Sequence, residues 1–462
     1  MRGVAVVLDA KYAEFLKRRA KYSDPQGFDP VWVPDFLFDF QKYMVEWACR
    51  EGRAALFEGC GLGKTPQQLV WAENVVRKTN RPVMLATPIA VGAQTVREAE
   101  KFGIAAKRTR NGKMTDEACV WVTNYEQLTK YDPSKFAGFV GDESSAIKDF
   151  KSERSGIVAD FCRSIPHRLL CSATPAPNDF DELGTSSEAL GRLGYRDMVT
   201  TFFRQEMNRD ASGWGRAKLR FRGHAEEPFW SWVCSWARAI RRPSDLGFND
   251  ERFDLPPLNE IEHVVQTAKP RPGMLFPVPA RDLREERAER RHTLRERCEL
   301  AAQIGCDVTG PVSWWAELND EADELERLIP GCEQVSGSDS DEAKEEKLTA
   351  FSTGELNRIV IKPSIGCWGL NWQHCADAVV FPSHSFERYH QLVHRFYRFG
   401  QMKPVNINLI VSEGEQGIIR SLRRKEQQVE QMFASIVAHM KDAMHLATQD
   451  VFKQKEVVPS WL

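Results

Sequence analysis

Three glycines in the segment FEGCGLGKT, which covers residues 57–65, are the first residues whose spacing suggests a chemical site. They stand between an apolar run and a helical pattern, where a strand would turn sharply into a helix. Backbone N–H groups in such a turn can surround phosphate oxygens, and the helix N-terminus adds a partial positive charge. Gly59, Gly61 and Gly63 therefore form a candidate phosphate-binding loop.

Lys64 and Thr65 close this loop and supply the two side chains that phosphate chemistry needs. The ammonium of Lys64 would reach the β and γ phosphates of a nucleotide, and the hydroxyl of Thr65 would bind Mg²⁺. A strict G-x-x-x-x-G-K-[ST] loop has glycine where this chain has Glu58, so the match is loose. On its own, the pattern also fits a glycine-rich turn with an exposed lysine.

The acidic pair Asp142 and Glu143, in GFVGDESSAIKD, is the second candidate site. The pair follows an apolar strand, so we expect it at the carboxyl edge of the sheet, where the phosphate loop also lies. Asp142 is the candidate Mg²⁺ ligand, and Glu143 can orient and deprotonate the attacking water. An acidic turn after a strand is common, but the two segments in this order predict a nucleoside triphosphatase.

Four further segments carry polar residues in the same frame. Three of them contain Thr87 and Pro88 (PVMLATP), Thr123 and Asn124 (VWVTNYEQL), and Ser172, Thr174 and Asn178 (RLLCSATPAPND). The fourth, HQLVHRFYRFGQ, contains Arg395 and Arg398, three residues apart on an expected helix. Residues at this spacing share a helix face, so both arginines would point across a cleft at a γ-phosphate. A solvated basic helix is the plainer alternative.

The elements that position these residues follow from an alternation of short apolar runs with longer amphipathic stretches. Such alternation predicts an α/β fold, with parallel sheets covered by helices on both faces. Two series of this kind occur along the chain. The expected strands cover residues 54–57, 83–86, 119–123, 137–140 and 169–172 in the first series, and 261–265, 359–361, 378–381 and 405–411 in the second.

The prolines of LPPL, at residues 255–258, break structure and suit a linker between two lobes. We expect an N-terminal segment over 1–30, a first lobe over 31–179 with a helical elaboration over 180–255, a second lobe over 256–412 and a helical C-terminal extension over 413–462. In the elaboration, Trp232 and Trp236 at i,i+4 suggest a buried helix face. Residues 281–297 carry seven arginines and five acids, a pattern usual for a solvated helix face with i,i+4 ion pairs.

Composition bounds the class of protein. Of the 462 residues, 42% are hydrophobic and 28% charged, with no apolar run long enough to cross a bilayer and no basic-then-apolar leader. The formal net charge of -2 means that any contact with a polyanion must come from local patches. The 11 cysteines include no C-x-x-C pair, which favours reduced thiols, and we expect a soluble cytoplasmic monomer.

In this order the motifs resemble those of the superfamily 2 helicase-like ATPases, above all the Swi/Snf branch in the compact versions carried by bacteriophages and prophages. The similarity spans residues 38–411. In that family the loop reads D-E-M-G-L-G-K-T, so the acid at Glu58 is a family trait. The resemblance implies two tandem RecA-like lobes, ATP hydrolysis with Mg²⁺ in the cleft between them, and movement along nucleic acid, with duplex DNA as the expected partner.

The resemblance also assigns residues one by one. The D-E-A-H box matches Asp142 and Glu143, and the branch's next residues match Ile147 and Lys148. The family's T-G-T-P-x-x-N matches Ser172 to Asn178, which implies that Ser172, Thr174 and Asn178 couple hydrolysis to movement. Its G-L-x-N matches Gly369 to Asn371, and its final D-R-x-H-R-x-G-Q matches His394 to Gln401, with Arg395 and Arg398 as the arginines. The implied ATP-binding residues are Gln41, which would read adenine, Gly59, Gly61, Gly63, Lys64, Thr65, Gly369 and Gln391.

A nucleic-acid groove across both lobes is also implied by the family. Its contacts would be Thr87, Pro88, Thr123, Asn124 and Ser364, which would face backbone phosphates. Phosphate contacts carry little sequence information. The near-neutral net charge suits transient contact that weakens with salt.

Two departures from the family pattern affect the coupling of hydrolysis to movement. Ser144 and Ser145 replace Ala-His, so the histidine that links the acidic box to the S-A-T segment is missing. His394 replaces an aspartate and Tyr397 a histidine, whereas both arginines remain. We expect hydrolysis to be retained and its coupling to differ.

Other functions remain open at this point. Within the motor class an RNA helicase is the alternative, and outside it a P-loop ATPase switch that acts on protein partners. A zinc site from His384, Glu387, His390 and His394 is disfavoured, because there is no H-E-x-x-H and no further ligand downstream. The short connection between Asn371 and Gln391 leaves no room for a strand-separating wedge, so we expect movement along duplex DNA without unwinding.

Overall fold

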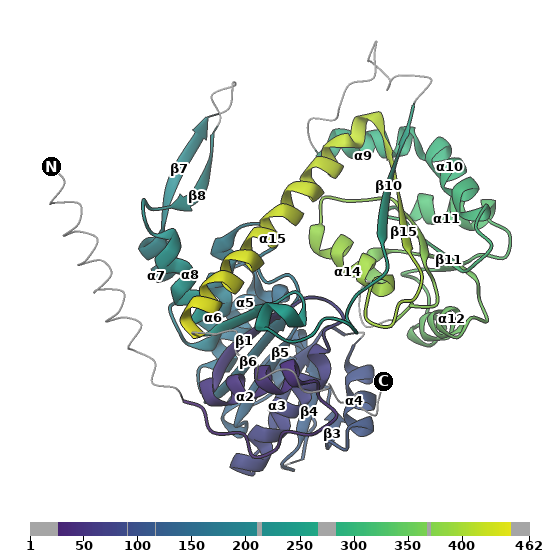
Figure 1. Ribbon diagram of the computed structural model, residues 1–462. Coiled ribbons are helices and arrows are strands. Elements are labelled where there is room, and N and C mark those ends of the chain that lie inside the picture. The colour runs from purple at the N-terminus through teal and green to yellow at the C-terminus, as the bar shows by residue number, and fades with distance from the viewer. Residues whose placement is uncertain are drawn as a thin grey trace. The chain divides into compact units, whose positions relative to one another are not determined.

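A computed structural model describes residues 26–89, 91–115, 117–209, 215–266, 283–366 and 371–444. The chain forms two compact units (Figure 1). The first comprises Met1–Asp250 with Gln428–Leu462, and the second comprises Glu251–Gln427. Each unit contains one parallel β-sheet with helices, which confirms the predicted α/β fold class.

The first unit follows the predicted rhythm of strands and helices. Its elements are α2 (Asp39–Glu51), β1 (Arg53–Glu58), α3 (Lys64–Thr79), β2 (Val83–Thr87), α4 (Gly92–Lys101), β3 (Ala106–Arg108), β4 (Val120–Asn124), β5 (Gly138–Asp142), α5 (Glu153–Cys162), β6 (His167–Ser172), α6 (Leu183–Leu190), α7 (Tyr195–Phe202), β7 (Phe203–Arg209), β8 (Gly215–Phe221), α8 (Glu226–Cys234) and β9 (Ala237–Ile240). The sheet has the order β3-β4-β2-β5-β6-β1-β9.

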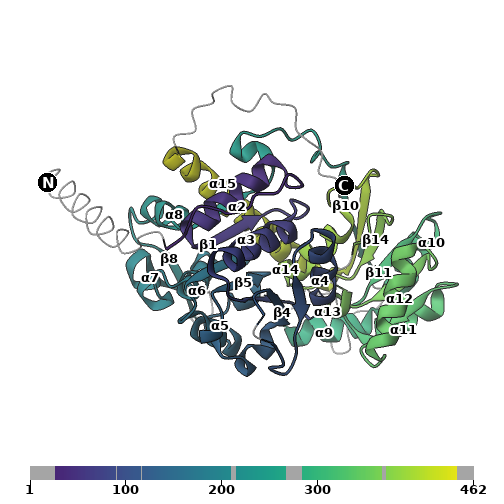
Figure 2. The ribbon, with the colours of Figure 1, turned by 90° about the horizontal axis from the view of Figure 1, so that it is seen from below.

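Helices cover both faces of this sheet, because its central strands are apolar along their whole length. Every residue of β2 is buried, and β1 and β6 are buried except at their first residue. Such strands need cover on both sides. Helices α2, α3 and α4 pack against one another as one group, and α5 and α6 form a second group (Figure 2). The fully buried side chains of Phe57, Trp71 and Phe139 mark the core between them.

The strand order brings three functional segments together. Strand β6 lies between β1, which leads into the phosphate loop, and β5, which leads into the acidic pair. In the register, Ser172 of β6 is opposite Phe57 of β1, and Cys171 is opposite Asp142 of β5. All these strands are parallel, so their carboxyl ends meet at one edge of the sheet, where ligands bind in such folds.

The prediction of a helical elaboration over residues 180–255 is only partly correct. Besides α6, α7 and α8 it contains the antiparallel ribbon of β7 and β8, which projects beside α7 and α8 (Figure 1), and the edge strand β9. Phe203 and Phe221 stack at the base of the ribbon, with ring centroids 4.8 Å apart. The predicted Trp232–Trp236 face is only partly correct: the two rings meet edge to face at 5.4 Å, but Trp236 lies beyond the end of α8.

The second unit repeats the parallel architecture. Its elements are β10 (Leu258–Val265), α9 (Leu283–His292), α10 (Leu294–Cys306), β11 (Val312–Trp315), α11 (Asn319–Leu328), β12 (Glu333–Val335), α12 (Asp341–Thr353), β13 (Arg358–Ile361), α13 (Pro363–Gly366), β14 (Asp377–Val380), α14 (Phe386–Phe396), β15 (Val405–Ser412) and the start of α15 (Gln416–Met444). The sheet order is β10-β15-β14-β11-β13-β12. Trp314, Trp315 and Trp372 are fully buried in its core.

A buried ionic network holds α10 to its neighbours in the second unit. Arg297 donates to Glu321 over 2.7 Å and lies 3.7 Å from Glu415, and all three side chains are almost fully buried. Removing one member of such a group leaves a buried charge without its partner, which costs about 3–5 kcal/mol. We therefore assign these residues a structural role.

Helix α15 begins in the second unit and ends in the first. In the second unit, Lys425 Nζ donates to the carbonyl of His384 over 2.8 Å. In the first unit, the thiol of Cys234 lies 3.4 Å from the carbonyl of Ile436. Among the described residues, no helix combines the length and the apolar character that crossing a membrane requires.

Candidate functional site

The phosphate loop joins β1 to α3 and is shaped by its glycines. Gly61 and Gly63 adopt left-handed φ values of 87° and 75°. A Cβ atom at Gly63 would lie 2.3 Å from Nε2 of Gln41, so a side chain there would displace this amide from the loop. The loop thus presents backbone to its surroundings at the N-terminus of α3, the geometry that favours phosphate binding.

Gln41 supports this loop from beneath. Its Nε2 donates to the carbonyl of Leu62 over 2.9 Å, and its Oε1 accepts from the backbone N–H of Phe38 over 3.0 Å. The side chain is almost fully buried. The amide predicted to read adenine is therefore bonded to backbone at both ends, which ties the start of α2 to the loop. Contact with adenine would require it to exchange one of these partners.

Lys64 folds back over the loop that precedes it. Its ammonium donates to the carbonyls of Glu58 and Gly59 over 3.0 and 3.3 Å. Burial alone would lower the pKa of Lys64, yet the pKa is raised because neighbouring groups favour the charged form. Those groups are Cys60, Glu143, Glu58 and Asp142. The lysine of the loop and the acidic pair therefore share one electrostatic environment.

Glu58 is the residue by which this loop departs from the strict pattern. Its side chain is fully buried, and burial raises its pKa to about 7, against the effects of Lys64 and of a hydrogen bond from Gln67. That bond joins Gln67 Nε2 to Glu58 Oε2 over 2.8 Å, while Glu58 Oε1 has no hydrogen-bond partner among the described residues. The carboxyl group thus braces the first turn of α3 from below.

Asp142 ends β5 and is held on two sides. Its Oδ1 accepts from Gln68 Nε2 over 2.7 Å, and its backbone carbonyl accepts from the hydroxyl of Tyr125 over 2.7 Å. Burial raises the pKa of Asp142, whereas the bond from Gln68 and the charge of Lys64 oppose that rise. Gln68 belongs to α3, so this bond links the acidic pair to the helix that starts at the phosphate loop.

Glu143 adopts a strained backbone conformation. Its φ of 53° lies in the left-handed region, which non-glycine residues rarely adopt and which is often found at active sites. Two hydroxyls donate to its Oε1: Ser172 over 2.7 Å and Ser145 over 2.8 Å. Ser145 stands where the family that the motifs resemble has histidine, and Ser172 contacts Glu143 directly.

These residues fit a nucleotide and Mg²⁺. The backbone at Gly63 is left-handed and leaves no free space for a Cβ beside the Gln41 amide, one ammonium is supplied by Lys64, and the oxygen donors Thr65 and Asp142 are the type that Mg²⁺ prefers. Thr65 lies in the first turn of α3, and Asp142 is bonded to the same helix through Gln68. One sheet edge therefore holds both the phosphate and the metal ligands predicted for the first lobe.

The remaining residues of the S-A-T segment are also ordered around hydrogen bonds. The backbone N–H of Thr174 donates to Ser172 Oγ over 3.0 Å, and the Thr174 hydroxyl is buried without a hydrogen-bond partner among the described residues. Asn178 donates from its side chain to Glu182 over 2.7 Å. Burial raises the pKa of Glu182 to about 7.

A small hollow at the carboxyl ends of β2 and β4 collects three of the predicted nucleic-acid contacts. Pro88, Thr123 and Asn124 line it. The structure adds residues that the sequence reasoning missed, namely Arg108, Thr109 and Arg110 from the end of the short strand β3. Thr87 does not line the hollow: it is fully buried, and its hydroxyl donates to the carbonyl of Pro88 over 2.7 Å. Ser364 lies exposed in α13 of the second unit.

The prediction that the two arginines of the second unit share one helix face is wrong. Helix α14 ends at Phe396, so Arg395 lies in its last turn and Arg398 lies in the turn that follows. The helix stops early because Tyr397 leaves helical geometry, with φ -89° and ψ 81°. Gln401 then fixes the turn by donating to the carbonyls of Gln373 and Phe396 over 3.0 and 3.1 Å.

Two other predicted ATP contacts belong to the second unit. Gln391 is buried on α14, and neither polar atom of its amide has a hydrogen-bond partner among the described residues. Gly369 lies outside the described residues.

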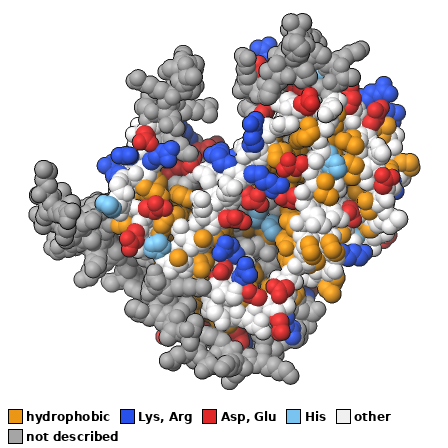
Figure 3. Space-filling view, turned by 45° about the horizontal axis from the view of Figure 1, so that its top comes forward, with side chains coloured by type: hydrophobic (Ala, Val, Ile, Leu, Met, Phe, Trp, Pro, Cys, Tyr) orange, Lys and Arg blue, Asp and Glu red, His pale blue; other side chains and the backbone are white. Residues whose placement is uncertain are grey.

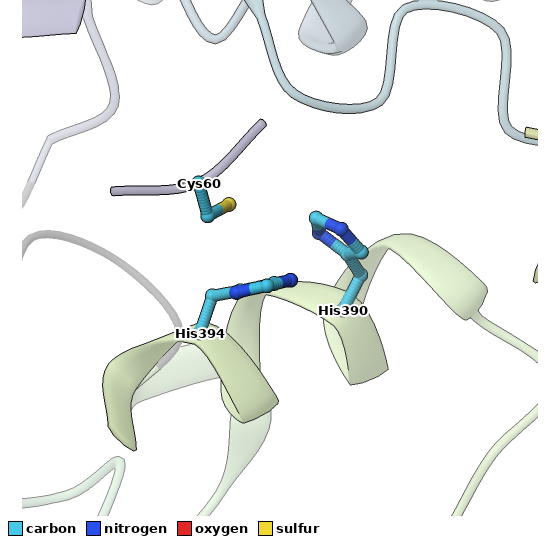
Figure 4. A group of neighbouring side chains, drawn as sticks. All are labelled: Cys60, His390 and His394. Carbon is cyan, nitrogen blue, oxygen red and sulfur yellow. The ribbon is translucent and has the colours of Figure 1, made fainter. Parts of the chain in front are cut away.

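The histidines considered for a zinc site fall into two groups. His384 Nε2 bonds to the carboxylate of Glu286 at 2.9 and 3.0 Å. His390 and His394 lie one turn apart on α14, and their rings are 4.2 Å apart (Figure 4). Cys60, also labelled in Figure 4, belongs to the phosphate loop of the first unit.

Comparison with known proteins gives one related sequence and several similar folds. No family model matches the chain. Over 177 residues it is 30% identical to a Caenorhabditis elegans SWI/SNF-related matrix-associated actin-dependent regulator of chromatin subfamily A-like protein 1 homolog, a match that covers 35% of this chain and 25% of that relative.

The similar folds come from solved structures with low sequence identity. S. cerevisiae Dbp5 bound to RNA and ADP BeF3 has a TM-score of 0.56 at 11% identity, covering 88% of this chain and 98% of that one. A second S. cerevisiae Dbp5 structure has a TM-score of 0.51 at 11% identity and covers 87% and 93%. The Sulfolobus solfataricus SWI2/SNF2 ATPase core in complex with dsDNA aligns over 94% and 99%, with a TM-score of 0.40 and 15% identity.

Proposed function

We propose that the chain is a superfamily 2 helicase-like ATPase of the Swi/Snf branch and that it hydrolyses ATP to move along duplex DNA. The observation that carries the proposal is the edge of the first sheet, where Lys64, Asp142, Glu143 and Ser172 follow neighbouring parallel strands. We place the activity in phage or prophage DNA metabolism, and we propose that a cytoplasmic monomer performs it.

The first unit would bind the nucleotide. Lys64 would leave the carbonyls of Glu58 and Gly59 and donate to the β and γ phosphates, while Thr65 and Asp142 hold Mg²⁺. The bound metal supplies charge neutralisation on the phosphates. Glu143 would orient the attacking water and accept its proton.

The second unit would complete the reaction. Arg395 and Arg398 are the candidates that neutralise charge on the γ-phosphate in the transition state. Arg395 is buried in the last turn of α14, whereas Arg398 lies in the turn that Gln401 holds in place. The two arginines would therefore be positioned by different parts of the chain. A turnover step that needs both units is what a motor requires, because lobe closure then gates hydrolysis.

Nucleic acid would be contacted through its backbone. The hollow at Pro88, Thr123 and Asn124, with Arg108 and Arg110 beside it, offers a helix N-terminus at Gly92 and two guanidinium groups to phosphates. Ser172 would transmit a shift of its segment on nucleic-acid binding to Glu143, which it contacts directly.

ATPase assays with duplex DNA, single-stranded DNA and RNA test this proposal. We expect duplex DNA to raise the ATPase rate more than the other two. Preferential stimulation by RNA would favour an RNA helicase. A rate that no nucleic acid changes would overturn the motor and favour the ATPase switch that acts on protein partners.

A further inference from the structure

Helix α9 differs from its surroundings in how its charges are distributed. On the face drawn in Figure 3, acidic and basic side chains of the described residues are interspersed, in keeping with the formal net charge of -2. The sequence of α9, LREERAERRH, alternates the two signs in the same way. The structure, however, sorts the charges of this helix onto different sides.

Two of the three acidic residues of α9 lie on its inward side. Glu286 accepts a hydrogen bond from His384 Nε2 over 2.9 Å. Glu289 is buried and lies against Gly414, where an added Cβ would come within 2.7 Å of its carboxyl carbon. Arg290, also on this side, pairs with Glu415 over 2.6 Å. The third acid, Glu285, is partly buried.

The outward side of α9 is basic. Arg284, Arg287, Ala288 and Arg291 are exposed and line one hollow in the surface. Their spacing of i, i+3, i+4 and i+7 places them on one helix face, along about 10 Å of its axis. Among the described residues, Arg287 and Arg291 have no ion-pair or hydrogen-bond partner. Three positive charges therefore face solvent beside a single methyl group.

We propose that this arginine face of α9, formed by Arg284, Arg287 and Arg291, binds the phosphate backbone of duplex DNA. The proposal rests on the proposed function and adds a contact separate from the hollow at Pro88 and Thr123, which belongs to the other unit. The guanidinium group matches phosphate because its planar fork donates two hydrogen bonds at once. Two arginines without an internal partner can do so without breaking an ion pair.

A nucleic acid fits this face better than an acidic protein surface. The centre of a protein interface is usually apolar and anchored by aromatic side chains, whereas this face offers only Ala288 between its arginines. The opposite side of α9 is used for anchoring through Glu286, Glu289 and Arg290, so the helix has no apolar side to insert into a membrane. The partner that best complements the three arginines is therefore a row of phosphates.

The test is the salt dependence of duplex binding by the full chain, measured with a fluorescent duplex for wild type and for R284Q/R287Q/R291Q. Each lost phosphate contact lowers the slope of log K against log salt by about 0.9, so the triple variant should lose about two to three units of slope and bind more weakly at low salt. The matched control is R295Q/R327Q in the same unit. These arginines are exposed but already paired with Glu299 and Glu324, at 2.8 and 2.6 Å, so the slope should stay at the wild-type value.

The outcomes separate this inference from the proposed motor. An unchanged slope in the triple variant, with DNA-stimulated ATPase in wild type, would overturn the inference and leave the motor standing. A reduced slope without DNA-stimulated ATPase in wild type would support the arginine face and overturn the motor. Polyglutamate serves as the probe for an acidic protein surface. If the triple variant loses polyglutamate binding but binds duplex as wild type does, the face would be assigned to an acidic protein instead. Wild type that neither binds duplex nor responds to it would overturn both.

Discussion

Ser172 Oγ donates a hydrogen bond to Glu143 Oε1 over 2.7 Å, joining the S-A-T segment directly to the candidate general base. Ser145 donates to the same oxygen over 2.8 Å. The contact arises because β6 lies between β1 and β5 and places Ser172 one residue beyond Asp142 in the register. A shift of the S-A-T segment would therefore change the position of Glu143 without any intermediate side chain.

The first prediction follows from this contact. Ser172→Ala should lower DNA-stimulated turnover by about tenfold or more, since a hydrogen bond to a charged group is worth about 1.5–3 kcal/mol. ATP affinity should stay at the wild-type value because Ser172 has no role in nucleotide binding. Ser172→Thr keeps the hydroxyl and should restore most of the rate. Stimulated turnover that is equal in wild type and Ser172→Ala would refute the coupling role.

The second prediction separates binding from chemistry in the first unit. Lys64→Ala should weaken ATP binding, because it removes the cation for the β and γ phosphates. Glu143→Gln should bind ATP normally and hydrolyse it at least ~10²-fold more slowly, because the amide cannot accept the proton of water. Equilibrium binding of a fluorescent ATP analogue and steady-state hydrolysis measure the two effects. Near wild-type hydrolysis by Glu143→Gln would show that the acidic pair has been assigned wrongly.

The third prediction concerns the arginines of the second unit. Arg398→Ala should reduce turnover by ~10³-fold, a typical effect for an arginine that stabilises transition-state charge, with little change in ATP affinity. Arg395→Ala should have a milder effect on turnover, and because Arg395 is nearly buried at the end of α14 it should also lower the unfolding midpoint. If both variants turn over ATP like wild type, the second unit does not complete the site and the switch function gains support.

The fourth prediction is a pH dependence of stability that comes from Glu58. Burial raises the pKa of Glu58 from 4.5 to about 7 in the folded chain, so folding favours the protonated carboxyl group. Its contribution to the free energy of unfolding is full below about pH 4.5 and is lost as the pH rises through about 7, a change of about 3 kcal/mol. Glu58→Gln removes this titration. The unfolding midpoint of the variant relative to wild type should therefore rise between pH 5 and pH 8, and parallel curves would contradict the assignment.

Much of the fold was predictable, because each expected strand overlaps a strand of the structure. The strands that escaped prediction are β3, β7, β8, β9, β11 and β12. Apart from β7 and β8 they are short, and β9 directly follows a tryptophan-rich stretch that does not alternate. The ribbon of β7 and β8 had a signal, the turn-like DASGWG between two alternating segments, but the surrounding tryptophans suggested a helix.

Site residues were predictable by type and order but not by contact. The bond between Ser172 and Glu143 depends on strand order, which no local pattern fixes. The end of α14 at Phe396 depends on Gln401, whose side chain bonds the turn from outside the helix. The sorting of charges on α9 depends on His384 and Glu415, which are far from α9 in the sequence.

The last prediction is that the protein moves along duplex DNA without separating its strands. The connection between Asn371 and Gln391 is occupied by β14 and the first half of α14, so no wedge can lie there. The β7–β8 ribbon is the other candidate for a wedge. Its described base is compact, with Phe203 stacked on Phe221 and Glu206 paired to Arg220 over 2.8 Å. We expect wild type to displace the third strand of a triplex with ATP and to leave a forked duplex intact.

The matched variant replaces residues 204–220 with a short Gly-Ser turn and keeps the stacked pair Phe203 and Phe221, so that the base of the ribbon can still close. If the ribbon is not a wedge, the variant should displace the triplex strand with ATP as wild type does, because hydrolysis drives the two units along a backbone and does not need the bases to part. Both assays use the same ATP concentration and the same duplex sequence. Efficient fork unwinding by wild type that disappears in this variant would identify the ribbon as a wedge and move the protein to the strand-separating helicases.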